Sequence, residues 1–300
     1  MKTPAFAICV LAVLPLSLAQ TAGNPQPQAR LRADSNLVLV PVAVVDRHNH
    51  PVTGLAKENF RVFDNATERP ISDFAMDDEP VAVGLVFDHS GSVGGAIGSE
   101  AAATRLFLET SNPDDEFSLV IFADRPEVTL ALTHDPGKVQ SRVFRIQSSG
   151  WTALYDAVML GLHELEKSSL KRKALLVVSD GGENHSRFNH RDLQRRVEES
   201  DALIYSICFD TRDTDFPLMK WMAELSGGRA FPATGWDLSD VAAKIGLELR
   251  NRYVLAFSAT GIPRDGKVHN LRVQLIPPRG MPSRRASWRR SYREPDDLIK

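Results

Sequence analysis

Short, almost continuous apolar runs alternate with amphipathic stretches over the middle of this 300-residue chain. A strand that has helices on both sides of its sheet has no polar face, so such runs predict buried strands. The predicted strands are residues 81–87, 117–122, 128–132, 174–178 and 203–209. The stretches after and between them carry apolar residues at helical spacing and predict helices over 101–110, 153–166, 191–199, 218–225 and 238–249.

Strands that alternate with helices in this way are typical of an α/β domain. We therefore expect a doubly wound, mostly parallel sheet flanked by helices, built from residues 80–250. Apolar, β-branched runs also occur before this region, at 37–45 and 60–63, and after it, at 253–257 and 268–276.

An isolated hairpin is only marginally stable, so the two flanks are expected to pair with each other. The N-terminal β flank (36–79) and the C-terminal β flank (251–293) would then form one small β unit, and residues 294–300 would be a tail.

The first residues resemble an export signal. Lys2 precedes an apolar run over 5–18, and Ser17-Leu18-Ala19 offers small residues for cleavage, so residues 1–19 are predicted to be a signal peptide. Residues 20–35 are polar, contain proline and predict a flexible lead-in. The apolar run is shorter than the ~20 residues of a membrane span, so no transmembrane span is expected in the mature chain. The predicted location is periplasmic, on the cell surface or secreted.

Composition and charge limit the classes of partner that the protein can bind. The chain has 43% hydrophobic and 25% charged residues and a formal net charge of −2, which is ordinary for a globular protein. Nucleic-acid binding needs a concentrated positive field, so no nucleic-acid partner is expected. Only Cys208 would remain after cleavage, and its apolar surroundings predict a buried side chain outside any disulfide. The arginine-rich segment 283–293 is either an anion-binding patch or, as we favour, an edge strand protected by charge.

Oxygen-bearing side chains follow predicted strands at two places and precede a predicted helix at a third. They are Asp88, Ser90, Ser92, Thr152 and Asp180. The carboxyl ends of parallel strands meet at one edge of a sheet, so these side chains are expected to lie together. Two carboxylates and three hydroxyls form an all-oxygen ligand set, which suits Mg2+ or Mn2+. The sequence therefore predicts a divalent-cation site.

Other interpretations of the same residues are weaker. Asp, Ser and Thr also favour turns and helix starts, so the set could be a collection of loop caps. A hydrolase built on Ser90, His89 and Asp88 is disfavoured because adjacent residues on an extended loop diverge. Phosphotransfer through Asp88 is disfavoured because serines stand where such enzymes need further catalytic groups. Glu183 and Asn184 are expected to be solvated loop residues.

The pattern Asp88-x-Ser90-x-Ser92, with Thr152 and Asp180-Gly181, resembles the metal-ion-dependent adhesion site of von Willebrand factor type A domains. The resemblance covers about residues 80–250, and all five motif positions are occupied. It implies that the three hydroxyls coordinate the ion directly or through water, and that the two carboxylates supply charge directly or from the second shell. It also implies an open metal position that a carboxylate of the ligand fills.

The flanking stretches 51–55, 60–62, 152–157 and 253–255 resemble an exported bacterial family of proteins related to von Willebrand factor A, over about residues 36–293. That family is defined by sequence, so the likeness concerns fold and compartment more than function. The leading hypothesis is an exported, non-enzymatic module in which Mg2+ or Mn2+ accepts an Asp or Glu carboxylate from an unidentified protein partner. The alternatives are a metal-assisted hydrolase, which needs a general base near the ion, and a structural protein whose metal only fastens loops.

Overall fold

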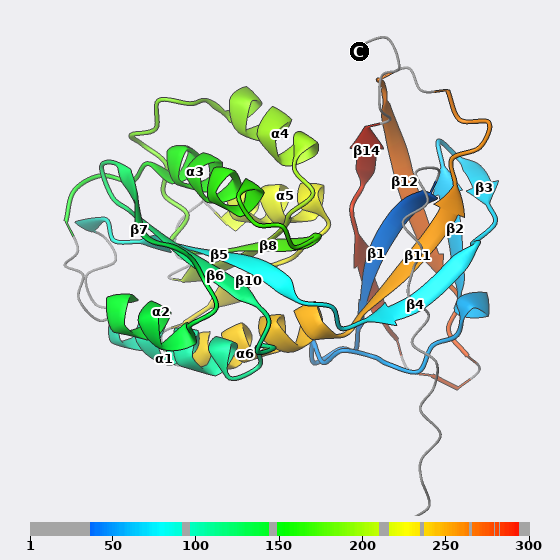
Figure 1. Ribbon diagram of the computed structural model, residues 1–300, viewed down its shortest axis with the longest axis horizontal. Coiled ribbons are helices and arrows are strands. Elements are labelled where there is room, and N and C mark those ends of the chain that lie inside the picture. Colours follow the sequence, from blue (N-terminus) through cyan, green and yellow to red (C-terminus); the bar gives the residue numbers. More distant parts are fainter. Residues whose placement is uncertain are drawn as a thin grey trace, which may run out of the picture.

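The computed structural model describes residues 37–91, 97–143, 149–209, 216–234, 237–263, 266–278, 280–281 and 283–293. Figure 1 shows two units side by side, an α/β unit and a smaller β unit. The strands are β1 (Leu37–Val45), β2 (Phe60–Asp64), β3 (Thr67–Arg69), β4 (Asp73–Asp77), β5 (Val81–Asp88), β6 (Glu116–Phe122), β7 (Pro126–Thr133), β8 (Arg172–Ser179), β9 (Leu203–Phe209), β10 (Ala230–Ala233), β11 (Arg252–Ser258), β12 (Val268–Leu275), β13 (Arg285–Trp288) and β14 (Ser291–Arg293). The helices are α1 (Ile97–Leu108), α2 (Pro136–Val143), α3 (Leu154–Glu166), α4 (His190–Glu199), α5 (Phe216–Ser226) and α6 (Leu238–Arg250), with one 3-10 turn, η1 (Lys57–Asn59).

The α/β unit is built on a six-stranded sheet of order β10-β9-β8-β5-β6-β7. Its strands are parallel except β7, which is antiparallel to β6. Helices α1, α2 and α6 cover one face, and α3, α4 and α5 cover the other, each with its own apolar core (Figure 1). All eight residues of β5 are buried, as expected for a central strand with helices on both sides. The predicted fold class is confirmed.

The β unit has two four-stranded sheets, β13-β1-β11-β4 and β14-β12-β2-β3. Each pairs the two ends of the chain, because β1 is antiparallel to β11 and β2 is antiparallel to β12. Buried and exposed residues alternate along β12, so one face of its sheet points into the core shared with the other sheet. The expectation that the flanks pair into one β unit is therefore correct.

Several short elements were not predicted. Helix α2 buries only two residues, Val139 and Val143, and the strands β3, β4 and β10 have three to five residues each. The arginine-rich segment forms the edge strands β13 and β14, as favoured. Arg289 donates to Asp201 (3.0 Å), the Arg290 guanidinium lies 4.6 Å from the Trp288 ring centroid, and Arg293 donates to the Gly266 carbonyl (2.6 Å).

The predicted signal peptide, lead-in and tail lie outside the described residues. In the part of the chain that the structure describes, no helix has both the length and the apolar character to cross a membrane. Cys208 is fully buried and forms no disulfide within the described residues, as predicted.

Gly161 allows α3 to approach the sheet closely. A Cβ atom there would lie 2.7 Å from Leu175 Cδ1 and 2.9 Å from Val86 Cγ2. Gly161→Ala is expected to lower the free energy of unfolding by about 1–2 kcal/mol, because overpacking outweighs the gain in helix propensity. Urea denaturation measures the change. Gly98→Ala in α1 is the matched control, since its Cβ would meet no described atom within 4 Å, and it should not destabilise; equal losses in both variants would contradict the packing explanation.

Candidate metal site

Three loops meet at the carboxyl edge of the six-stranded sheet, at the end of the α/β unit away from the β unit (Figure 1). They follow β5, precede α3 and follow β8, and β5 lies directly beside β8. Backbone hydrogen bonds join them. Gly91 N–H donates to the Gly150 carbonyl (3.1 Å), and Asn184 N–H donates to the Thr152 carbonyl (3.0 Å). The loops are therefore held together by the protein's own hydrogen bonds.

Asp88 lies at the end of β5 and is fully buried. Its Oδ1 accepts the Ser90 N–H (2.9 Å), and its Oδ2 accepts the Ser179 hydroxyl (2.5 Å). Burial raises the pKa of the Asp88 carboxyl to about 6; the hydrogen bonds from Ser179 and Ser90 oppose the rise, and the negative charge of Asp180 adds to it. The two carboxylates are thus close enough to repel each other.

Thr152 and Asp180 face the same space beside Gly182. A Cβ atom at Gly182 would lie 3.4 Å from Asp180 Oδ1 and 3.6 Å from Thr152 Oγ1. Gly181 has a φ of +92°, a conformation that glycine adopts without strain, and it turns the chain sharply after β8. The backbone N–H and C=O of Thr152 both bond to the loop after Asp180, whereas its hydroxyl makes no hydrogen bond within the described residues.

The structure thus brings Asp88, Ser90, Thr152 and Asp180 to one edge of the sheet, while Ser92 lies outside the described residues. Among the described side chains, no Lys, Arg or His forms an ion pair with Asp88 or Asp180. Two neighbouring carboxylates without a cationic partner, together with hydroxyl oxygens, suit a divalent ion with oxygen ligands. That these residues bind a metal remains a prediction.

Glu183 and Asn184 are not merely solvated loop residues, contrary to the expectation. Glu183 Oε2 accepts the Tyr155 N–H (2.8 Å) at the start of α3, where the N-cap residue Ala153 has no side-chain oxygen to offer. Asn184 Oδ1 accepts the Thr152 N–H (2.9 Å). Both side chains position the Thr152 loop. No local pattern predicts these contacts, because the partners are about thirty residues apart along the chain.

His89 points away from the carboxylates. Its ring is buried, and Nε2 lies 3.3 Å from Glu100 Oε2 on α1, a contact within ion-pair distance but without hydrogen-bond geometry. The pair links the loop after β5 to α1, a contact that was not predicted from the sequence.

The Asp88 pKa predicts how the stability of the metal-free protein depends on pH. The folded state holds this proton with a pKa of about 6, against an ordinary value of 3.8 in the unfolded chain. The contribution of Asp88 to the free energy of unfolding is therefore fully present below about pH 4. It falls by about 3 kcal/mol as the pH rises through 6. Urea denaturation in EDTA between pH 4 and pH 7 measures it. Asp88→Asn keeps an acceptor for Ser90 N–H and should remove this part of the decline; an identical pH profile in the variant would refute the assignment.

Comparison with known proteins supports the fold. Residues 83–183 match the family model of the von Willebrand factor type A domain. This stretch therefore matches a von Willebrand factor type A domain in sequence, and its α/β fold agrees with that match. A von Willebrand factor type A structure from Catenulispora acidiphila is 11% identical, covers 86% of this chain and 72% of its own, and gives a TM-score of 0.52. Proximal thread matrix protein 1 from the mussel byssus is 17% identical. The match covers 62% of this chain and 50% of that protein's chain, with a TM-score of 0.51. At these identities the likeness shows the fold.

Curated relatives are similar over parts of their length. Human inter-alpha-trypsin inhibitor heavy chain H4 is 26% identical over 166 residues, which are 50% of this chain. An uncharacterized protein of Synechocystis, sll0103, is 26% identical over 125 residues, which are 41% of this chain. The chain spans only 18% and 30% of the length of these two relatives. The likeness therefore concerns a part of each relative rather than the whole protein.

Proposed function

We propose that this chain is an exported interaction module that binds a protein partner through a divalent metal ion. Mg2+ or Mn2+ would be held by Asp88, Ser90, Ser92, Thr152 and Asp180. The observation that carries the proposal is the pair of neighbouring carboxylates, Asp88 and Asp180, which have no cationic partner among the described residues and share their edge with the unused Thr152 hydroxyl. A divalent ion would neutralise both carboxylates.

The partner would supply an Asp or Glu carboxylate. A divalent ion that keeps a water ligand can exchange that water for a carboxylate oxygen, which is also a hard ligand. Domains of the von Willebrand factor type A family often mediate protein–protein interaction or adhesion, which agrees with such an exchange. The predicted signal peptide at residues 1–19 supports action outside the cytoplasm, where a partner would be met in the periplasm, at the surface or in the medium.

The surroundings of the site favour binding over hydrolysis. Metal-assisted hydrolysis needs a general base that reaches a metal-bound water. The two candidates beside the motif have other contacts, because His89 is buried against Glu100, and Glu183 accepts hydrogen bonds from Tyr155 N–H and from Ser186. The alternative in which the metal only fastens loops is less favoured, since backbone hydrogen bonds already join the three loops.

Mn2+ is a suitable probe because the relaxation of water protons reports the water bound to it. Residues 20–300 are expected to bind one Mn2+ ion and thereby to speed the relaxation of water protons, because the protein-bound ion tumbles more slowly than the free ion. Mg2+ should compete and reverse this increase. Adding N-acetyl-aspartate amide should displace metal-bound water, whereas N-acetyl-asparagine amide should not. Failure to bind either ion at millimolar concentration would refute the proposal. Metal binding with a raised melting temperature but no response to the aspartate compound would favour the structural alternative.

A further inference from the structure

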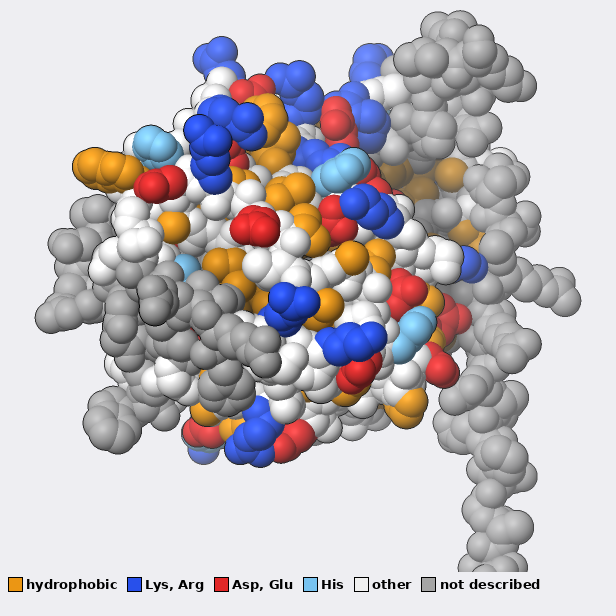
Figure 2. Space-filling view, turned by 60° about the vertical axis from the view of Figure 1, so that its left-hand side comes forward, with side chains coloured by type: hydrophobic (Ala, Val, Ile, Leu, Met, Phe, Trp, Pro, Cys, Tyr) orange, Lys and Arg blue, Asp and Glu red, His pale blue; other side chains and the backbone are white. Residues whose placement is uncertain are grey.

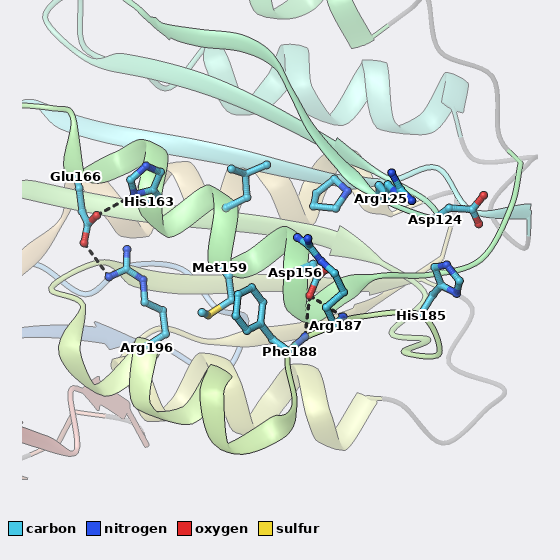
Figure 3. A pocket seen from close by; sticks show the side chains of 12 residues that line it. Asp124, Arg125, Asp156, Met159, His163, Glu166, His185, Arg187, Phe188 and Arg196 are labelled. Carbon is cyan, nitrogen blue, oxygen red and sulfur yellow. Dashed lines mark hydrogen bonds and ion pairs between the residues drawn. The ribbon is translucent and has the colours of Figure 1, made fainter.

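A groove of about 730 Å3 lies beside the candidate metal site, between α3, α4 and the turn that joins β6 to β7 (Figure 3). Its volume is within the range of ligand-binding pockets, roughly 300–1,000 Å3. Its floor is largely apolar and its two ends are polar. The apolar lining residues are Pro126, Met159, Leu160 and Phe188, and the polar ones are Asp124, Arg125, Asp156, His163, Glu166, His185, Arg187 and Arg196.

One end of the groove adjoins the metal-site loops. Asp124 Oδ1 accepts the Trp151 N–H (2.6 Å), one residue before Thr152, and His185 N–H donates to the Thr152 carbonyl (3.2 Å). The His185 ring stacks on the Trp151 ring, with centroids 6.4 Å apart and planes at 13°. Trp151 is 61% exposed, so an aromatic surface lies between the metal site and the groove.

The acidic groups of the groove are already occupied by the protein. Asp156 accepts the Arg187 and Phe188 N–H groups (3.0 and 3.1 Å) and the Arg187 Nε–H (3.0 Å). Glu166 is bound by Arg196 Nη1 (2.7 Å) and contacts His163 Nδ1 (3.2 Å). Asp156 and Glu166 are therefore paired with arginines of the protein. The third carboxylate of the groove, Asp124, is engaged through Oδ1 by the Trp151 N–H.

Two guanidinium groups at the end near the metal site keep unused donors. Arg125 is exposed and makes no hydrogen bond or ion pair within the described part of the chain. Arg187 is held through Nε alone, and its side chain is 83% exposed, so its terminal nitrogens have no partner among the described residues. Figure 2 shows basic side chains lying among hydrophobic ones on this unit. A free fork of N–H donors beside an apolar floor suits a carboxylate followed or preceded by an apolar residue.

We propose that the groove binds an extended acidic peptide segment of the partner, continuous with the residue whose carboxylate reaches the metal. An apolar side chain of this segment lies on Met159 and Phe188, and a second carboxylate binds Arg125 and the terminal nitrogens of Arg187. The inference rests on the proposed function and adds a second acidic anchor to it. A single metal–carboxylate contact selects any exposed acid, whereas two anchors at a fixed separation select a sequence.

A displayed library of peptides with one fixed central aspartate and random flanks tests the inference. Selection is made on the full chain in millimolar Mg2+, on Arg125→Ala, and on Arg191→Ala, which removes an exposed arginine of α4 outside the groove. The wild type and Arg191→Ala are expected to enrich peptides with a second Asp or Glu near an apolar residue. Arg125→Ala should enrich Mg2+-dependent peptides without that second acid.

The best peptide and its variant with the second acid changed to the amide are then measured on each protein. The change should weaken binding about fivefold on the wild type and leave binding to Arg125→Ala unchanged, because an exposed charge pair contributes up to about 1 kcal/mol. Equal effects on the two proteins would overturn the inference. So would enrichment of apolar sequences without a second acid.

The outcomes separate this inference from the proposed function. Peptides that need Mg2+ and the fixed aspartate but show no second acid leave the metal site standing and overturn the acidic anchor. In another outcome, the peptides still prefer a second acid when Mg2+ is chelated and the fixed aspartate is replaced, and this preference depends on Arg125. That result would support the groove and refute the metal-dependent function. Enrichment of no peptide on any of the three proteins overturns both.

Discussion

Replacing Asp180 by alanine is expected to weaken Mg2+ binding by at least about 100-fold, since loss of an outer hydrogen-bond partner of a metal ligand alone costs about 10–100-fold. Asp180 supplies one of two negative charges at the site, and Asp88 would be left as the other. The fold should tolerate the change, because within the described residues Asp180 Oδ1 accepts only the Gly182 N–H (3.1 Å). Calorimetric titration with Mg2+ and thermal unfolding of the same samples measure both expectations.

Asp114→Ala is the matched control. Asp114 is exposed and precedes β6, at the edge of the sheet opposite to the metal site. The Asp114→Ala variant also loses one carboxylate from the α/β unit, so it controls for the general change in charge. Equal loss of Mg2+ binding in both variants, or full binding by Asp180→Ala, would show that the ion is not held at this edge.

Glu248→Ala is expected to lower the free energy of unfolding by about 3–5 kcal/mol, because it leaves buried charges uncompensated. Glu248 lies in α6, fully buried. Its Oε1 accepts the Tyr205 hydroxyl (2.8 Å), and its Oε2 accepts Arg229 Nη1 (2.6 Å). Arg252 at the start of β11 donates to the same hydroxyl (2.7 Å). Urea denaturation followed by two probes, fluorescence and circular dichroism, measures the loss.

The size of this effect follows from where the network lies. Arg229 also donates to Asn49 Oδ1 (2.5 Å), in the turn after β1, so the network joins the α/β unit to the β unit. Burial holds the pKa of the Tyr205 hydroxyl above its ordinary value, which keeps it protonated as a donor to Glu248. The matched control is Glu224→Ala in α5, whose side chain is half-exposed and lies 3.9 Å from Lys220. It should cost no more than about 0.5 kcal/mol, and a similarly small cost for Glu248→Ala would contradict the network.

The apolar pattern predicted the α/β architecture because the central strands are buried on both faces. The run 81–87 became β5 (Val81–Asp88), and the helical periodicity of 153–166 became α3 (Leu154–Glu166). Elements with little burial escaped the pattern. Helix α2 buries two valines, and β10 has only four residues, so neither has enough apolar positions to show a period.

The candidate site was predictable in its residues but not in its support. Asp88 and Asp180 follow predicted strands, and strand order brings their loops together. Ser179, by contrast, is one of the buried residues at the end of β8, and its hydroxyl donates to Asp88 across the strand pair. Glu183 and Asn184 hold the Thr152 loop through contacts that only the fold creates.

The sequence by itself determined the fold class, the pairing of the two β flanks, the burial of Cys208 and the residues offered for a metal. These depend on periodicity and residue type, which are local properties of the chain. Only the tertiary structure decided that, among the residues it describes, the site carboxylates have no cationic partner and Arg125 lies unpaired beside a groove. It also decided that Glu248, Arg229 and Arg252 are buried together. The neighbours of a charged side chain are set by which distant segments pack against it, and the energy of a charge depends on those neighbours and on its distance from water.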